Sequence, residues 1–93
     1  MDYKKVVEIK KQKIIKKEIK RFKRGCLKEF RQNIKIGISE THITLHTYLR
    51  NDLREAASEI AIVELRKENP EIDFYYYYDG FMNSWKNMRM RLK

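Results

Sequence analysis

The sequence predicts a small α+β domain in the order α-β-β-α-β-α, with a long basic N-terminal helix and a short C-terminal helix. Two patterns lead to this fold class. Apolar residues recur at helical spacing over residues 11–33, and they alternate every second residue in several later segments. The chain has 93 residues, 42% of them hydrophobic, which suffices for one domain with one modest core. We therefore expect a single domain, with a basic helical segment at 1–33 and an α+β core at 34–93.

The first helix is predicted from about Lys11 to Asn33. The residues of its apolar face recur at steps of three and four: Ile15, Ile19, Phe22, Cys26 and Phe30. Residues 3–10 fit either a short strand or the first turns of this helix. Gly25 lowers helix stability by about 1 kcal/mol relative to Ala, so a bend or an end at this position is left open.

A β-hairpin is predicted to follow the first helix. Residues 34–38 alternate and are rich in β-branched side chains, and residues 43–49 alternate again after a turn. For residues 41–51 the alternative is a helix that starts at Thr41, because apolar residues also recur there at steps of four. We prefer the hairpin because a clear helix start follows it.

That start is Asp52, and the second helix is predicted to run from there to about Glu68. Asp52 and Glu55 have the spacing of a capping box, and Asn69-Pro70 ends the helix. The residues expected to face inward are Leu53, Ala56, Ala57, Ile60 and Val63.

The last part of the chain is predicted to form a strand and a short helix. Residues 72–78 alternate, so that Tyr75 and Tyr77 share one face and the other aromatic residues share the opposite face. A turn is expected at residues 79–80. Apolar residues then recur at steps of four, three and four between Phe81 and Leu92, which is the spacing of a helix.

Positive charge is concentrated at the two ends of the chain. Residues 1–35 contain 14 Lys/Arg and 4 Asp/Glu. Residues 36–85 contain 4 Lys/Arg and 9 Asp/Glu, and residues 86–93 contain 4 Lys/Arg and no Asp/Glu. The net charge is +9. Such asymmetry is typical of a protein that binds a polyanion. The alternative is that the basic ends pair with the acidic middle of the same folded chain.

These patterns predict a small nucleic-acid-binding accessory protein, with RNA favoured over single-stranded or duplex DNA. Lysine outnumbers arginine 11 to 3 in residues 1–35, and lysine makes few bidentate contacts with bases, so we expect phosphate contacts of low sequence specificity. Exposed tyrosines on the strand at 72–78 would stack on unpaired bases. The predicted binding residues are Lys10, Lys11, Lys13, Lys16, Lys17, Lys20, Arg21, Lys23, Arg24, Lys28, Arg31, Tyr75, Tyr77, Lys86, Arg89 and Arg91.

Two further function classes remain open. A protein modulator of the phage or mobile-element type would bind a nucleic-acid-processing protein through an acidic surface. Its acidic residues would be Glu55, Glu59, Glu64, Glu68, Glu71 and Asp73. The third class is a small metal-independent ribonuclease. Its proton shuttles and charge stabilisers would be His42, His46, Tyr75 and Arg89. The sequence has no phosphate-binding glycine loop, and we expect no catalysis.

Cofactors, membranes and disulfides are not expected. His42 and His46 lie four residues apart, but no compact Cys/His set completes a metal site. Cys26 is the only cysteine, and the N-terminus is rich in lysine rather than apolar, so a cytoplasmic location is expected. No apolar run is long enough to span a membrane. The stripe of Ile and Phe on the first helix offers a seam for a homodimer.

Overall fold

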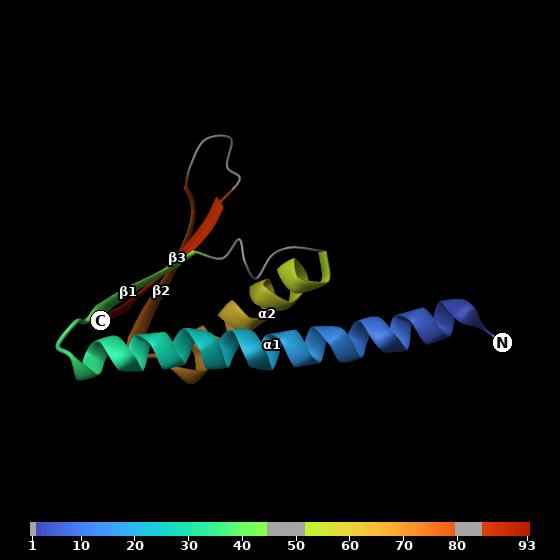
Figure 1. Cartoon of the computed structure of the whole chain (residues 1–93), viewed down its shortest axis with the longest axis horizontal. Helices are drawn as coiled ribbons and strands as arrows, with labels where there is room; N and C mark the ends of the chain where they lie inside the picture. Colours follow the sequence, from blue (N-terminus) through green and yellow to red (C-terminus); the bar gives the residue numbers. More distant parts are fainter. Residues whose placement is uncertain (1, 45–51, 80–84) are drawn as a thin grey trace.

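The computed structural model describes residues 2–44, 52–79 and 85–93. Two helices and three strands form one small α+β unit (Figure 1). The elements in chain order are α1 (Tyr3–Lys35), β1 (Glu40–Thr44), α2 (Asp52–Glu68), β2 (Ile72–Asp79) and β3 (Trp85–Leu92). The predicted α+β class and the long N-terminal helix are confirmed. The observed order, α-β-α-β-β, lacks the predicted strand before β1 and ends in a strand instead of a helix.

Helix α1 is continuous over 33 residues, so residues 3–10 are helical. The carboxylate of Asp2 caps the helix by accepting a hydrogen bond of 3.2 Å from the backbone N–H of Lys5. Gly25 lies inside the helix and does not end it. The predicted apolar face is confirmed, and its most deeply buried members are Phe22, Cys26 and Phe30. The part of this stripe from Phe22 to Phe30 is therefore covered by the chain's own core. Ile15 and Ile19 are only partly buried, and a homodimer through this stripe stays a prediction.

The predicted strand at residues 34–38 is wrong, because this segment is the end of α1. Gly37 has a φ of 82°, the left-handed conformation that glycine adopts most readily. Its N–H donates to the carbonyl of Ile34 at 3.0 Å, and the N–H of Ile38 donates to the carbonyl of Asn33 at 2.8 Å. These two bonds form a Schellman motif, which satisfies the last carbonyls of the helix.

The three strands form one antiparallel sheet in the order β1-β3-β2. Strand β3 pairs along its length with β2, from Trp85 opposite Asp79 to Leu92 opposite Ile72. Its other edge pairs with β1. The predicted hairpin before α2 is wrong, since β1 finds its partner more than 40 residues later in the chain. The predicted strand residues after Thr44, namely 45–49, lie outside the described residues.

Strand β3 replaces the predicted C-terminal helix. Side chains alternate strictly from Asn87 to Leu92, with Met88 and Met90 fully buried and Arg89 and Arg91 on the opposite face. This two-residue period competes with the helical spacing that begins at Phe81. Pairing with both β1 and β2 favours the strand, because it satisfies the backbone of β3 on both edges.

Helix α2 has the predicted bounds, but it presents a different face to the core. Ile60 and Val63 are 45% and 52% exposed, which corrects the prediction that they face inward. Ala57 is buried as predicted. The buried residues among the described side chains of α2 are Ala57, Ser58, Ala61, Ile62 and Leu65. Three of these are small, which allows α2 to approach α1 closely. The side chains of the predicted capping pair, Asp52 and Glu55, lie outside the described part of the structure.

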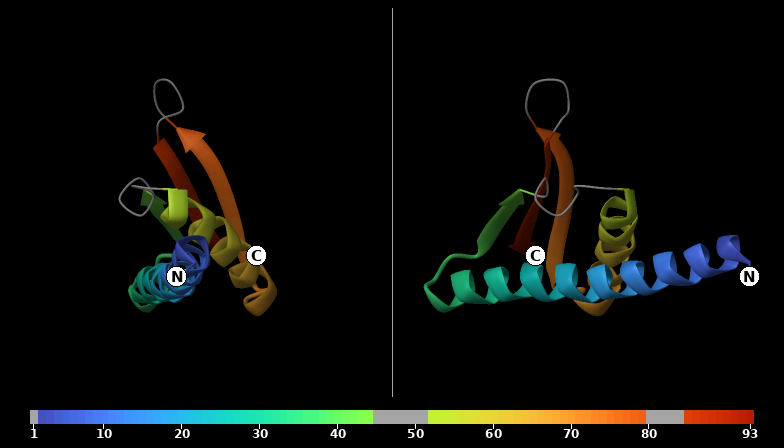
Figure 2. Two further views of the ribbon diagram at one scale, coloured as in Figure 1. Left: turned by 90° about the vertical axis from the view of Figure 1, so that its right-hand side faces the viewer. Right: turned by 45° about the vertical axis from the view of Figure 1, so that its right-hand side comes forward.

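Alternation along the strands gives the sheet an inner and an outer face. The inner face joins α1 and α2 in one hydrophobic core through Ile43, Ile72, Phe74, Met88 and Met90. The predicted division of residues 72–78 between two faces is confirmed for residues 72–77. Figure 2 shows α1 passing below the strands with α2 beside it. Because both helices pack into this core, the described residues leave the outer face of the sheet uncovered.

The Schellman motif gives a first prediction. Gly37→Ala should lower the free energy of unfolding by about 1 kcal/mol, because an L-residue with a Cβ is disfavoured at this φ. A Cβ at this position would meet no atom within 4 Å, so the cost comes from the backbone alone. Gly37→Asn, which tolerates the left-handed region better, is the matched control and should lose less. Urea unfolding followed by circular dichroism measures both, and equal losses would contradict this account.

Candidate nucleic-acid interface

Cations on α1 form a row on the side of the helix that faces away from the core. From residue 10 onward, a Lys or Arg occurs at every third or fourth position. These eight residues, which we call the α1 row, are Lys10, Lys13, Lys17, Lys20, Arg24, Lys28, Arg31 and Lys35. With 3.6 residues per turn, this spacing keeps them on one side, opposite Phe22, Cys26 and Phe30. At 1.5 Å per residue the row is about 37 Å long.

The α1 row carries uncompensated positive charge. All eight side chains are exposed, and none of them makes an ion pair with another described residue. No acidic residue interrupts the row, since Glu8, Glu18 and Glu29 fall at other positions around the helix. Lys35 was not among the predicted site residues, although its three-and-four spacing from Lys28 and Arg31 would have identified it.

Two of the predicted α1 site residues are paired with acidic side chains. Arg21 lies 3.5 Å from a carboxylate oxygen of Glu18 on the next turn. Lys23 reaches α2, where its Nζ lies 2.6 Å from Glu68 and 3.7 Å from Glu64. The hydrogen bond that Lys23 donates to the Glu68 carboxylate raises the pKa of Lys23, so this ammonium stays charged as a bridge between the helices. The predicted Lys11 and Lys16 are exposed beside the row and unpaired among the described residues.

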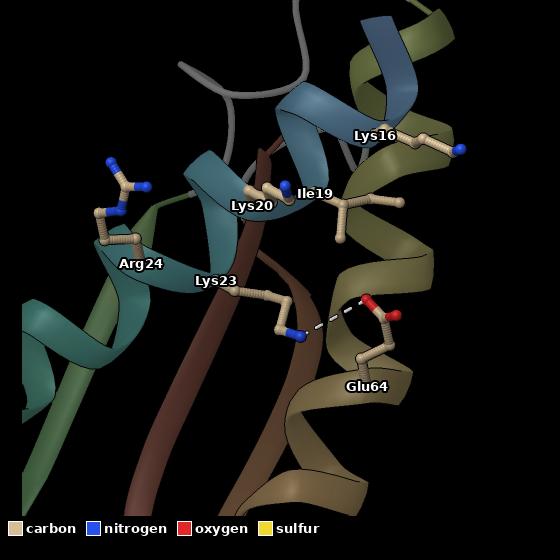
Figure 3. A pocket seen from close by; sticks show the side chains of 6 residues that line it. All are labelled: Lys16, Ile19, Lys20, Lys23, Arg24 and Glu64. Atoms are coloured by element: carbon tan, nitrogen blue, oxygen red, sulfur yellow. Dashed lines mark ion pairs between the residues drawn. The ribbon is translucent and has the colours of Figure 1, made fainter. Parts of the chain in front are cut away.

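A groove of about 460 Å³ separates the two helices beside the α1 row. It is lined by Lys16, Ile19, Lys20, Lys23, Arg24 and Glu64. Lys23 points across the groove toward Glu64, whereas Arg24 points away from it (Figure 3). Among the cations that line this groove, the acidic middle of the chain pairs with Lys23 and leaves Lys16, Lys20 and Arg24 without an ion pair to a described residue.

The outer face of the sheet brings together four of the predicted residues. Tyr75 and Tyr77 project from β2 and stack on each other, with ring centroids 5.5 Å apart and planes 25° apart. Arg89 is the residue of β3 directly opposite Tyr75, and its guanidinium carbon lies 5.1 Å from the centre of the Tyr75 ring. Arg91 follows on the same face. The side chain of the predicted Lys86 lies outside the described residues.

Cross-strand contacts hold these groups in position. Arg89 Nε lies 3.4 Å from Glu40 Oε1, and the same carboxylate oxygen lies 3.2 Å from His42 Nε2. The hydroxyl group of Tyr77 lies 3.4 Å from His42 Nδ1. The face therefore combines aromatic, guanidinium and imidazole groups in a connected set across all three strands.

The acidic and basic groups described on the outer face lie in pairs. Arg91 lies 3.6 Å from Asp73, just as Arg89 lies beside Glu40. The formal charges of these two arginines and two acids sum to zero. This surface therefore differs in kind from the α1 row, which is strongly positive. The two surfaces lie on opposite sides of the molecule, because α1 meets the inner face of the sheet with the side opposite to its row.

The described residues contain no group of three or more His, Cys, Asp or Glu side chains that could hold a metal ion. His46 lies outside them. Cys26 is only 2% exposed, and burial raises the pKa of its thiol to about 12, with a further contribution from the charge of Glu29. The thiol is therefore protonated at neutral pH, which makes it a poor ligand and a poor nucleophile.

Neither of the two described helices is both long enough and apolar enough to cross a membrane. The chain matches no protein-family model, no curated protein and no solved structure.

The buried thiol gives a second prediction. Above a pKa of about 9 the cysteine of the unfolded chain loses its proton while Cys26 in the folded chain keeps it, so alkaline pH favours unfolding. Between pH 8 and pH 10 the stability advantage of the wild type over Cys26→Ala should shrink by about 1.4 kcal/mol. All other ionisable groups are common to the two proteins, so their contributions cancel in this difference. Urea unfolding at the two pH values measures it, and an unchanged difference would show that the thiol ionises in the folded state.

Proposed function

We propose that this protein binds RNA through its phosphate backbone, with the α1 row as the principal contact surface. The main support for this proposal is the run of eight exposed cations, which is about 37 Å long. The row contains no acidic residue, and none of its cations makes an ion pair with a described residue. The acidic middle of the chain could have neutralised α1, but among the described cations of that helix it reaches only Lys23.

The affinity of such a surface comes mainly from the release of counterions. Each phosphate that meets a Lys or Arg releases condensed cations from the nucleic acid, so binding weakens steeply with added salt. Six members of the α1 row are lysines, which act as point charges and read little sequence. We therefore propose binding with low sequence specificity.

The shape of the molecule supports a backbone contact along α1. The first buried residue of α1 is Phe22, and residues 2–14 are exposed on every side. This part of the helix extends beyond α2 and the sheet (Figure 1). The two members of the α1 row in this part, Lys10 and Lys13, can therefore meet a nucleic-acid backbone without interference from the core. RNA is favoured because folded RNA also supplies unpaired bases, for which exposed Tyr75 is suited.

A specific arrangement favours RNA cleavage as a second candidate function. His42, Glu40 and Arg89 form a connected group on the outer face of the sheet, with separations of 3.2 Å and 3.4 Å through the Glu40 carboxylate. A carboxylate and an imidazole can together remove a proton from a ribose 2′-hydroxyl and return one to the leaving 5′-oxygen, while a guanidinium stabilises the phosphate. The products would be a 2′,3′-cyclic phosphate and a free 5′-hydroxyl.

Docking on a nucleic-acid-processing protein through an acidic surface has less support. Of the acids nominated for this role, Glu64 and Glu68 pair with Lys23, and Asp73 pairs with Arg91. These pairs reduce the acidic charge that the folded chain offers to a basic partner.

The α1 row gives a third prediction. In a variant with Gln at Lys13, Lys17, Lys20 and Arg24, the slope of log affinity against log salt should fall by about 3 to 4 for duplex RNA, because about one counterion is released per contact. Fluorescence anisotropy between 50 and 200 mM salt measures the slope.

The matched control removes the same number of charges away from the row, with Gln at Lys4, Lys5, Lys67 and Lys93. This variant should keep a slope close to that of the wild type. If the two variants lose equally, affinity depends on net charge alone, and the α1 row is not the binding surface.

The second candidate function gives a fourth prediction. If the outer face cleaves RNA, purified protein should cut a labelled single strand in the presence of EDTA, and a 2′-deoxy residue at the cut site should block the reaction. His42→Ala and Glu40→Gln should each reduce the rate at least about 100-fold, which is the usual contribution of a general acid or base. Intact RNA after prolonged incubation with the wild type would eliminate this candidate.

A further inference from the structure

The outer face of the sheet has a composition that suits planar, polar ligands. Its described side chains include no aliphatic residue. They are Glu40, His42, Thr44, Asp73, Tyr75, Tyr77, Asn87, Arg89 and Arg91. Protein interfaces are usually centred on apolar or aromatic anchors that fill a pocket, and here the tyrosine rings stand on an open sheet without aliphatic neighbours. Rings, guanidinium groups and hydrogen-bonding side chains are instead what single-stranded nucleic acid requires.

The tyrosine rings are already arranged for stacking. Tyr75 is 52% exposed, although an aromatic ring gains free energy when it is covered. Tyr77 stacks beside it and is tied to His42, while Arg89 lies over the Tyr75 ring and is held by Glu40. Because these contacts fix the side chains before any ligand arrives, little side-chain entropy would be lost on binding.

The balanced charge of this face also distinguishes it from the α1 row. A site that attracts phosphates needs excess cations, whereas the stacking of bases depends on exposed rings, beside which cations can hold the backbone of the strand. The outer face has the rings, with the paired Arg89 and Arg91 beside them. The α1 row, on the opposite side of the molecule, has the excess cations.

We propose that the outer face of the sheet is a separate site for unpaired RNA bases, so that one molecule holds a paired segment on the α1 row and an unpaired segment on Tyr75 and Tyr77. The second half of this statement rests on the proposed function of the α1 row, and the site on the sheet does not. A protein with this geometry would join two RNA segments, or two parts of one RNA, without contacts between the segments themselves.

The experiment compares two RNA probes by anisotropy: a single strand of about 12 nucleotides without self-pairing, and a blunt duplex. The double variant Tyr75→Ala/Tyr77→Ala should lose about 5- to 100-fold in affinity for the single strand and keep its affinity for the duplex. Tyr75→Phe/Tyr77→Phe retains both rings and should bind the single strand nearly as well as the wild type. Tyr3→Ala, which removes a tyrosine that is 74% exposed at the start of α1, is the matched control and should change neither affinity.

Thermal melting shows whether each variant is folded, and the Phe pair keeps the test valid if the Ala pair is unstable. Single-strand affinity within twofold of the wild type in the folded Ala pair would overturn the site on the sheet. Equal losses for both probes would overturn its separation from the α1 row.

A capture assay tests whether both sites are occupied together. Immobilised duplex should retain the labelled single strand when wild-type protein is added. Retention should be lost with the Ala pair, and also with the variant that carries Gln at Lys13, Lys17, Lys20 and Arg24. If the single strand instead displaces wild-type protein from the duplex, the two probes share one surface and the proposal fails.

The assays separate this proposal from the proposed function. If duplex affinity does not depend on the α1 row while single-strand affinity depends on the tyrosines, the proposed function of the α1 row fails and the site on the sheet stands. The opposite result would leave the α1 row as the only RNA contact.

Discussion

The packing of one side of α1 against the inner face of the sheet determines the rest of the structure. Phe22, Cys26 and Phe30 are each less than 5% exposed, and they belong to the same core cluster as Met88 and Met90 of the sheet. Once this side of the helix is buried, the cations spaced three and four residues apart must point away from the protein. The same contact occupies one face of the sheet and leaves the other open. Hydrophobic burial thus fixes the place of both polar surfaces.

Much of the fold follows from residue patterns, and the errors arise where two patterns overlap. The helix at 52–68 and the strand at 72–78 were predicted because their signals are local: a capping pair, a proline and strict alternation. Residues 34–38 also alternate, but the conformation is decided by Gly37 and its helix-ending bonds. From Asn87 to Leu92 a strand period coincides with part of a helical one, and only pairing with the distant β1 decides between them. Propensity cannot supply that long-range contact.

Part of the candidate site could also be predicted from the sequence. The basic character of α1 and the shared face of Tyr75 and Tyr77 follow from charge and alternation. The link between Arg89, Glu40 and His42 does not, because it requires the register of three strands. The sequence also could not show that Lys23 serves as a helix-to-helix bridge, which depends on how α2 lies against α1.

The proposed separation of phosphate contacts on the α1 row from base contacts on the outer face has an electrostatic reason. Unpaired cations beside Tyr75 and Tyr77 would attract any phosphate backbone, so the outer face would no longer distinguish unpaired from paired RNA. Pairing Arg89 with Glu40 and Arg91 with Asp73 removes that excess and still leaves one guanidinium beside an exposed ring. In the proposed function, the long-range field of the chain comes mainly from the α1 row, which would draw RNA toward the protein from the opposite side. An RNA bound by the row would then reach the tyrosines only through a second, unpaired segment, and this is why we propose two-segment binding over a single continuous footprint.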